Sequence, residues 1–358
     1  MTTPAAARPT LPPLAPTPTR ILVKEVNWLG DLVMTLPALR AVRRAFPHAR
    51  LSVLVKQELA SALEGARWLD EIIPYRIRGA LAGLGDRRRL IGALRAHRFD
   101  LAILFPRSFE SALWAALARI PRRVGFVGDG RGPLLTHAAR RDAALLRQHQ
   151  VHDYLQLLRA TLGIIGDTAD AGLDVEPRHR AAVDAWLAAR RRRRGPLVAL
   201  APAAAYGPAK EWPAGQWMAL IDRLAARHGA ECVLVGAPSE RARGEQIAAG
   251  TRHGALVAAG ETTVGEAIAM LSRCTGFAGN DSGSMHAAGA LGVPTVGIFG
   301  STDPRRTAPL GPRTRVVSHQ IACSPCLART CRYGHYECLT KVSVEEVEAN
   351  LVALGAFG

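Results

Sequence analysis

Residues 21–31 (ILVKEVNWLGD) carry the pattern that decides the fold of this 358-residue chain. The first six of these residues form a short β-prone run, and a turn is expected at Asn27–Gly30. The apolar side chains that follow stand at helical spacing: Leu32, Leu36, Leu39 and Val42. Another β-prone run begins at Leu51, after a helix-ending proline. A strand, a turn, a helix and a second strand form the repeating unit of a parallel α/β sheet.

The same alternation of strands and helices fills the rest of the chain in two series. The first continues to about residue 118, and the second begins with a buried strand expected at Leu197–Leu200. We therefore predict an α/β fold with two doubly wound, Rossmann-like domains facing a central cleft. The boundary is expected near the basic run Arg190–Arg194, which serves either as a solvated helix end or linker, or as a binding patch. These limits give a disordered leader at 1–19, an N-terminal domain at 20–189 and a C-terminal domain at 190–358.

The composition indicates a globular protein with a large excess of positive charge. The chain has 46 Lys and Arg against 30 Asp and Glu, a formal charge of +16. This excess favours a polyanionic partner, such as nucleic acid, an anionic membrane surface or a phosphorylated glycolipid, or it reflects the use of arginine as a solubilising residue. No run reaches the roughly 18 apolar residues of a membrane span. The Pro-rich N-terminus has no apolar signal core, so we expect a cytoplasmic protein.

The first candidate site residue follows the first expected strand. Ligands in doubly wound sheets bind beyond the carboxyl ends of the strands, so the loops there are the places to search. Asp31 stands in such a loop, at the start of a helix. It is either an N-cap, whose carboxylate accepts free backbone N–H groups, or a general base that projects into the cleft.

A second loop, Ala201–Pro213, follows the strand that opens the second series and is dense in small residues. Small residues let backbone N–H groups approach phosphate oxygens, and Lys210 supplies a positive charge. The loop matches neither a Walker A nor a GxGxxG pattern. A phosphate-binding loop and a plain connection are therefore both open.

A third loop, Gly279–Gly289, follows a strand and opens a helix, an arrangement that favours an anion. Asp281 and Ser282 are either caps or ligand contacts, and His286 is either a structural histidine or a ligand contact. Glu240 follows another expected strand. It is either an ordinary helix-start residue or a ligand for ribose hydroxyls.

Four segments, in this order and spacing, resemble those of glycosyltransferase family 9, the family of the ADP-heptose:lipopolysaccharide heptosyltransferases. They are WLGD at 28–31 with PAL at 37–39, FPRSFESA at 105–112, YGPAKEWP at 206–213 and NDSGSMH at 280–286. The similarity covers nearly the whole chain after residue 20, and it is strongest to the heptosyltransferase II type. It implies the GT-B arrangement, with the acceptor bound by the N-terminal domain and the ADP-sugar by the C-terminal domain.

The resemblance further implies an inverting, metal-independent transfer of L-glycero-D-manno-heptose. The donor would be ADP-L-glycero-β-D-manno-heptose, and the acceptor the first heptose of the lipopolysaccharide inner core on Kdo2–lipid A. Asp31 would be the catalytic base, and Lys210 would stabilise the ADP leaving group. The other donor contacts that the resemblance suggests are Tyr206, Gly207, Glu240 at the ribose, Asp281, Ser282, Gly283 and His286. The acceptor contacts are Trp28, Arg107 and Ser108.

The partners that follow from this interpretation are an ADP-sugar, the phosphorylated lipid A–Kdo–heptose acceptor and, peripherally, the cytoplasmic surface of the inner membrane, but no nucleic acid. Two positions depart from the family pattern: Ala203 stands where Gly is usual, and Ala205 where an acidic residue is usual. The nearest alternative is another family 9 transferase, of the type I or III kind, with a different acceptor. A dehydrogenase would need a Gly-rich fingerprint after the first strand, which residues 27–31 do not supply. A non-enzymatic polyanion-binding protein is a remote alternative.

Four of the six cysteines form one cluster in the sequence, Cys323-x2-Cys326-x4-Cys331-x6-Cys338. In a cytosolic protein this spacing suggests zinc before disulfides. The ion would be structural, closing a loop away from the chemistry, and catalysis would need no cofactor. Reduced thiols and a disulfide are the alternatives.

Overall fold

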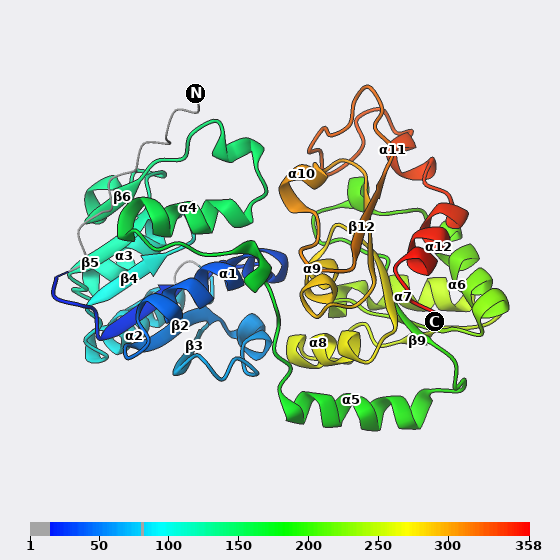
Figure 1. Cartoon of the computed structure of the whole chain (residues 1–358), viewed down its shortest axis with the longest axis horizontal. Coiled ribbons are helices and arrows are strands. Elements are labelled where there is room, and N and C mark those ends of the chain that lie inside the picture. The colour runs from blue at the N-terminus through cyan, green and yellow to red at the C-terminus, as the bar shows by residue number, and fades with distance from the viewer. Residues whose placement is uncertain (1–14, 80–81) are drawn as a thin grey trace, which may run out of the picture.

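The computed structural model describes residues 15–79 and 82–358, and within them it contains two six-stranded parallel sheets (Figure 1). The strands of the first sheet, in chain order, are β1 (Arg20–Lys24), β2 (Arg50–Lys56), β3 (Glu71–Tyr75), β4 (Leu101–Leu104), β5 (Arg122–Phe126) and β6 (His137–Ala139). Those of the second are β7 (Leu197–Ala201), β8 (Glu231–Leu234), β9 (Leu256–Val257), β10 (Gly276–Asn280), β11 (Thr295–Phe299) and β12 (Thr314–Ser318).

The two sheets have the same topology. The spatial order is β3-β2-β1-β4-β5-β6 in the first and β12-β11-β10-β7-β8-β9 in the second, so each order reverses beside its own first strand. These reversals lie between β1 and β4 and between β7 and β10. The two doubly wound domains of the α/β prediction are thereby confirmed. Ligands bind at such switch points, beyond the carboxyl ends of the strands.

Helices connect the strands in both halves. In the first half they are α1 (Leu29–Ala45), α2 (Ala82–Ala96), α3 (Phe109–Leu117), α4 (Val151–Leu162) and α5 (Pro177–Arg190). In the second half they are α6 (Ala214–His228), α7 (Arg241–Ala249), α8 (Val264–Ser272), α9 (Gly283–Ala290), α10 (Pro304–Thr307), α11 (Glu337–Thr340) and α12 (Val344–Ala353).

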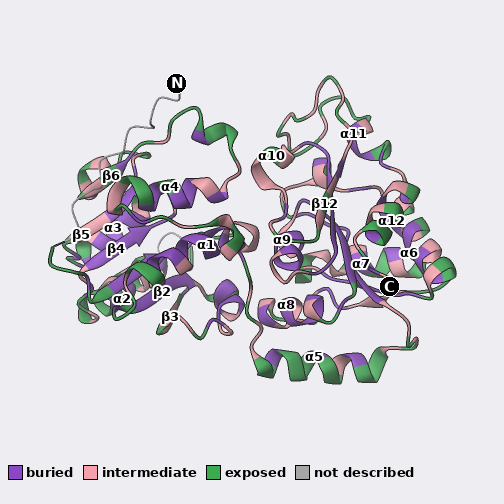
Figure 2. Cartoon of the chain, viewed as in Figure 1, coloured by how far each residue is buried: buried purple, intermediate pink, exposed green. Residues whose placement is uncertain are grey.

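Each sheet is buried on both faces. On β1, Ile21 and Val23 join one buried cluster and Leu22 joins another, because successive side chains of a strand point to opposite faces. Burial is accordingly concentrated in the strands and the inner sides of the helices, while the outer sides are exposed (Figure 2). In the second domain Trp212 and Trp217 are fully buried, with ring centroids 4.9 Å apart, edge to face.

Two helix contacts tie the halves of the chain together. The start of α1 packs on the start of α9 across the cleft, and α5 lies beneath the second domain, against α8 (Figure 1). The ion pair between Arg273 and Asp184 belongs to this second contact. The predicted domain boundary between residues 189 and 190 stays a prediction. The disordered leader was predicted at 1–19, and residues 1–14 of it lie outside the described part of the chain.

Candidate functional site

Asp31 projects from the first turn of α1 towards the domain interface. Trp28 is the N-cap residue of this helix, and no side chain makes a capping hydrogen bond there. Asp31 Oδ1 instead accepts a hydrogen bond from Gln150 Nε2 at 2.9 Å. Burial raises the pKa of the Asp31 carboxyl, and the hydrogen bond from Gln150 and the charge of Lys210 oppose that rise. A buried carboxylate with a raised pKa is suited to accept a proton.

Gly30 serves a purpose other than the predicted turn. The prediction of a turn through Gly30 is wrong at that residue, since α1 already begins at Leu29. A Cβ at position 30 would lie 2.8 Å from His286 Cδ2, and one at Gly283 would lie 2.9 Å from Leu29 Cβ. The two glycines therefore allow the starts of α1 and α9 to touch. This contact brings Asp31 of one domain beside the anion-favouring loop of the other.

The loop after β7 is held in place by a buried asparagine at the end of β10. Asn280 Nδ2 donates to the carbonyl of Pro202 at 2.8 Å, and Asn280 Oδ1 accepts the N–H of Trp212 at 3.0 Å. Lys210 Nζ lies 4.9 Å from the centroid of the Tyr206 ring, and the guanidinium carbon of Arg329 lies 5.1 Å from it. Gly207 has φ of 141°, and a Cβ there would meet the Arg329 carbonyl at 2.6 Å. The loop thus has a fixed shape that small residues permit.

Lys210 and Asp281 form a salt bridge at the switch point of the second sheet. Lys210 Nζ lies 2.7 Å from Asp281 Oδ2, and the two side chains are only 14% and 5% exposed. Thr302, just after β11, donates its hydroxyl to the same carboxylate oxygen at 2.7 Å. A buried cation at the carboxyl edge of a parallel sheet is well placed to meet a phosphate group.

The start of α9 presents polar atoms that no protein group satisfies. Ser282 occupies the N-cap position, yet its hydroxyl makes no capping hydrogen bond. Among the described residues, Ser282 Oγ and His286 Nδ1 are buried without a hydrogen-bond partner. Burial lowers the pKa of His286 to about 4, although Asp281 opposes the shift, so the imidazole is neutral near pH 7. Buried polar atoms of this kind, at a helix N-terminus, are ready to bind a ligand.

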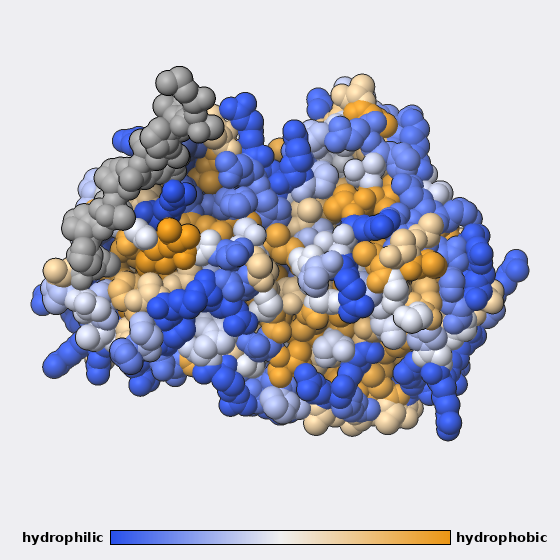
Figure 3. Space-filling model, viewed as in Figure 1, coloured by the Kyte–Doolittle hydropathy of each residue, from blue (hydrophilic) through white to orange (hydrophobic). Residues whose placement is uncertain are grey.

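A pocket of about 310 Å³ opens beside Asp31 on the N-terminal side of the cleft. Trp28 lines it and is 64% exposed, and Arg107 follows β4. The sequence prediction did not name the remaining charged and polar side chains on its wall as site residues; they are Asn27, Arg141, Gln150, Asp153, Tyr154 and Arg306. Its volume suits a small polar ligand group. In the space-filling view the two domains part at the top of the molecule, beside α4 and α10 (Figure 3).

The predicted residues Ser108 and Glu240 each accept a local backbone hydrogen bond. Ser108 is the N-cap of α3, where its hydroxyl accepts the N–H of Ser111 at 3.4 Å. Glu240 Oε2 accepts the N–H of Ala237 at 2.8 Å, and burial raises the pKa of this carboxyl. The structure thus brings Asp31, Lys210, Asp281 and His286 together, while their charges affect one another. The roles suggested for all the predicted site residues stay predictions.

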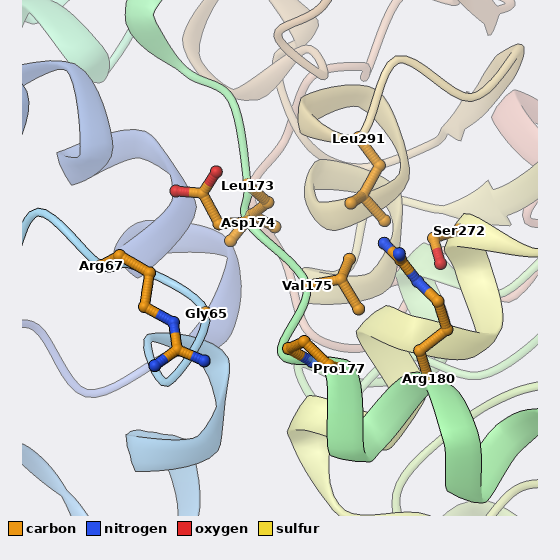
Figure 4. A pocket seen from close by; sticks show the side chains of 9 residues that line it. All are labelled: Gly65, Arg67, Leu173, Asp174, Val175, Pro177, Arg180, Ser272 and Leu291. Atoms are coloured by element: carbon orange, nitrogen blue, oxygen red, sulfur yellow. The ribbon is translucent and has the colours of Figure 1, made fainter.

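A larger hollow, of about 530 Å³, lies elsewhere, at the linker between the domains (Figure 4). Arg67 comes from the first domain, Arg180 from α5 and Leu291 from the segment after α9. Asp174, the carboxylate of its lining, is already engaged by Arg40 and by Trp68 Nε1. We assign this hollow to the hinge and not to the chemistry.

The cysteine segment contacts the loop that carries Lys210. The Leu327 carbonyl accepts the Tyr206 hydroxyl at 2.6 Å, and the Arg329 carbonyl accepts the N–H of Ala209 at 3.0 Å. The prediction that this segment lies away from the chemistry is therefore wrong. All six cysteines are free, and within residues 15–79 and 82–358 no three or more His, Cys, Asp or Glu side chains are gathered as metal ligands. The structural zinc is not confirmed, and no catalytic step is derived from it.

No helix in the described part of the chain is long and apolar enough to cross a membrane.

The fold and site together define a class: two-domain transferases of GT-B architecture. In this class a carboxylate of one domain, here Asp31, faces a positively charged site for anions in the other domain, here at Lys210. A sequence profile described as "Glycosyltransferase family 9 (heptosyltransferase)" matches residues 87–337. The chain belongs to glycosyltransferase family 9 and is a glycosyltransferase.

Individual relatives agree with this assignment. The chain is 31% identical to lipopolysaccharide heptosyltransferase 2 of Salmonella typhimurium over 83% of its own length and 87% of the relative's. It is 29% identical to the Escherichia coli protein of the same name, over 94% and 98% of the two chains. The structure of E. coli ADP-heptose lps heptosyltransferase II has a TM-score of 0.80 to this chain at 28% identity, with 94% and 98% of the two chains covered.

Proposed function

We propose that this protein transfers L-glycero-D-manno-heptose from ADP-L-glycero-β-D-manno-heptose to the first heptose of the lipopolysaccharide inner core, carried on Kdo2–lipid A. The observation that carries the proposal is the contact between the starts of α1 and α9, which brings Asp31 near Lys210 of the other domain, whose charge lowers the pKa of Asp31. The relatives named heptosyltransferase 2 support the choice of donor and acceptor.

The reaction is a single displacement that inverts the anomeric carbon and needs no metal ion. Asp31 takes the proton of the acceptor hydroxyl while the oxygen of that hydroxyl forms a bond to the anomeric carbon of the donor. The bond from that carbon to the diphosphate breaks, and its electron pair leaves with ADP. Lys210 offsets the negative charge that develops on the departing diphosphate.

The C-terminal domain holds the donor. Ser282 Oγ and His286 Nδ1, which lack protein partners among the described residues, hydrogen-bond the diphosphate or the transferred sugar at the start of α9, beside Asp281 and Gly283. Tyr206 and Gly207 shape the loop against the nucleotide. Glu240 binds the ribose hydroxyls.

The N-terminal domain holds the acceptor. Trp28 offers an exposed aromatic face to a sugar ring, and Ser108 lies at the start of α3 near the same strand ends. Arg107, Arg141 and Arg306 surround the pocket beside Asp31, which suits the carboxylates and phosphates of the inner core. With the net charge of +16, this favours peripheral binding at the cytoplasmic surface of the inner membrane.

The structural zinc at Cys323, Cys326, Cys331 and Cys338 stays a prediction. Metal analysis of the purified protein tests it. About one zinc per chain, lost together with thermal stability on chelation, would establish it. Metal-free protein with four reactive thiols would exclude it.

ADP release in EDTA tests the proposed function. We expect release from ADP-heptose only when heptosyl-Kdo2–lipid A is also present, and release at least about 100-fold slower with the Asp31→Asn variant. Release only with unheptosylated Kdo2–lipid A would replace the type II assignment with type I. Release only with an acceptor that already carries two heptoses would replace it with type III. A requirement for a divalent cation would contradict the metal-free mechanism.

A further inference from the structure

Gln150, just before α4, connects Asp31 to the other domain. Its side-chain Nε2 donates to Asp31 Oδ1 at 2.9 Å and to the Tyr154 hydroxyl at 3.0 Å. Its backbone N–H donates to the carbonyl of Arg306, which belongs to the C-terminal domain, at 2.9 Å. One residue therefore contacts the base and the opposite side of the cleft.

The Gln150 amide is held in one orientation. Asp31 as a carboxylate only accepts hydrogen bonds, so the NH2 group of Gln150 must face it. Burial keeps the pKa of Tyr154 well above that of a free tyrosine, so its hydroxyl remains a neutral acceptor. The Tyr154 ring is itself fixed edge-on against Phe105, with centroids 5.2 Å apart. With Oδ1 of Asp31 engaged in this way, Oδ2 is the atom left to accept the substrate proton.

Arg306 holds the segment that carries Gln150. Its guanidinium donates to the carbonyls of Leu145, at 2.9 Å, and Gln148, and it pairs with Asp153 at 3.3 Å. His149 Nε2 lies 2.9 Å from the carbonyl of Ala308 in the same way. The α10 segment thus faces the start of α4 across the interface (Figure 1). These contacts exist only while the domains are together, because the partners come from different domains.

We propose that Gln150 is a positioning residue for Asp31 and that Arg306, by fixing the 145–153 segment, makes the orientation of the base depend on domain closure. This inference rests on the proposed function of Asp31. It goes beyond that function, since it explains why Asp31 is correctly oriented as a base only when the two domains are closed.

The hydrogen bond from Gln150 also favours the ionised form of Asp31. The titratable and charged groups that surround Asp31 come from several elements: Glu25 after β1, Arg107 after β4, Arg141, Asp153 and Tyr154 on or before α4, and Lys210, Asp281, His286 and Arg306 of the other domain. None of these groups is substituted in Gln150→Leu, and Tyr154, which loses the hydrogen bond from Gln150, keeps a neutral hydroxyl because of its burial. A shift in the pH profile of a Gln150 variant therefore reports on the Gln150–Asp31 hydrogen bond.

The test compares Gln150→Leu, Gln150→Glu, Arg306→Met and the control Arg305→Met. Arg305 neighbours Arg306 in α10, but its side chain is 75% exposed and pairs with Asp303 of the same segment. For Gln150→Leu we expect kcat to fall about 10- to 100-fold, as for loss of a hydrogen bond to a charged group. The acid limb of its pH profile should move to higher pH while the Kd for ADP changes less than twofold. Gln150→Glu should move the limb further in the same direction.

Arg306→Met should lower kcat and move the acid limb as Gln150→Leu does, and the double variant should lose little more than either alone. Arg305→Met should behave as the wild type. A lower kcat with an unmoved acid limb, or losses that multiply in the double variant, would overturn the inference. A wild type that transfers no heptose would instead overturn the proposed function. NMR titration of ¹³C-labelled Asp carboxyls, assigned with Asp31→Asn, still tests the Gln150–Asp31 bond in that case.

Discussion

Lys210 Nζ and Asp281 Oδ2 are 2.7 Å apart in a site where the lysine is 14% and the aspartate 5% exposed. Each charge is compensated by the other, and Thr302 donates its hydroxyl to the same carboxylate oxygen at 2.7 Å. The lysine is thereby held at the carboxyl edge of the second sheet without a mobile side chain to order on ligand binding.

We expect Lys210→Met to weaken ADP binding by about 10- to 100-fold, the loss of a charge-assisted contact to phosphate. Isothermal titration with ADP measures this. The variant should also unfold at lower temperature, because Asp281 is left buried without its cation. The double variant Lys210→Met with Asp281→Asn should regain thermal stability but not ADP affinity. Unchanged ADP affinity in both would remove Lys210 from the phosphate site.

Asp31→Asn should lower kcat by about 10²–10⁴ with the Kd for the donor nearly unchanged, because the amide cannot take a proton. Burial raises the pKa of the Asp31 carboxyl, and the base must be ionised to work. Activity should therefore fall, as the pH is lowered, at a higher pH than for an exposed aspartate. Initial rates at saturating donor across the pH range check this. An acid limb at the ordinary aspartate position would contradict it.

Gly30→Ala should lower kcat, because its Cβ would lie 2.8 Å from a ring carbon of the buried His286 and would push α1 and α9 apart. Gly92→Ala is the matched control, since a Cβ in that part of α2 meets nothing within 4 Å. The control should keep full activity and gain roughly 0.5–1 kcal/mol of stability from helix propensity. Equal activity of the two variants would show that close contact of α1 and α9 is not needed for catalysis.

Lys24→Met should stabilise the protein at pH 6. Lys24 is 3% exposed, and burial lowers its pKa to about 7, while burial raises the pKa of the adjacent Glu25 to about 7. At pH 6 the folded protein must therefore hold a buried ammonium beside a neutral carboxyl. Removing that cost should raise the free energy of unfolding by about 1–3 kcal/mol.

The pH dependence of this gain follows from the lowered pKa of Lys24. Because the unfolded lysine titrates near pH 10, the destabilisation by Lys24 is complete below about pH 7 and disappears as the pH rises towards 10. Denaturant unfolding of both proteins at pH 6 and pH 9 measures it. The exposed Lys341→Met serves as control, with a change within about 0.5 kcal/mol. A gain that grows with pH would contradict the account.

The fold could be predicted from the sequence because the buried strands are continuous apolar runs, as at Leu197–Leu200, and because helical spacing separates them. The rule that ligands bind beyond strand ends then selected Asp31, Lys210 and Asp281, which the structure brings together. Thr302 follows β11 in the same manner and was reachable by that rule.

The remaining site residues could not be predicted in this way. Neither Gln150 nor Arg306 directly follows a strand in the sequence. The two residues meet only because the two domains close on each other. The space that Gly30 leaves for His286 is likewise a property of the interface. Periodicity describes how a segment packs within its own domain, and it contains no information about which loops of two domains will touch.

The most direct test of the central claim is the mass of the acceptor after incubation with ADP-heptose and the protein. We predict that heptosyl-Kdo2–lipid A gains one heptose with the wild type, that Asp31→Asn adds it at least about 100-fold more slowly, and that Kdo2–lipid A without heptose is unchanged. A wild-type protein that leaves heptosyl-Kdo2–lipid A unmodified, or an Asp31→Asn variant that modifies it at the wild-type rate, would contradict the account.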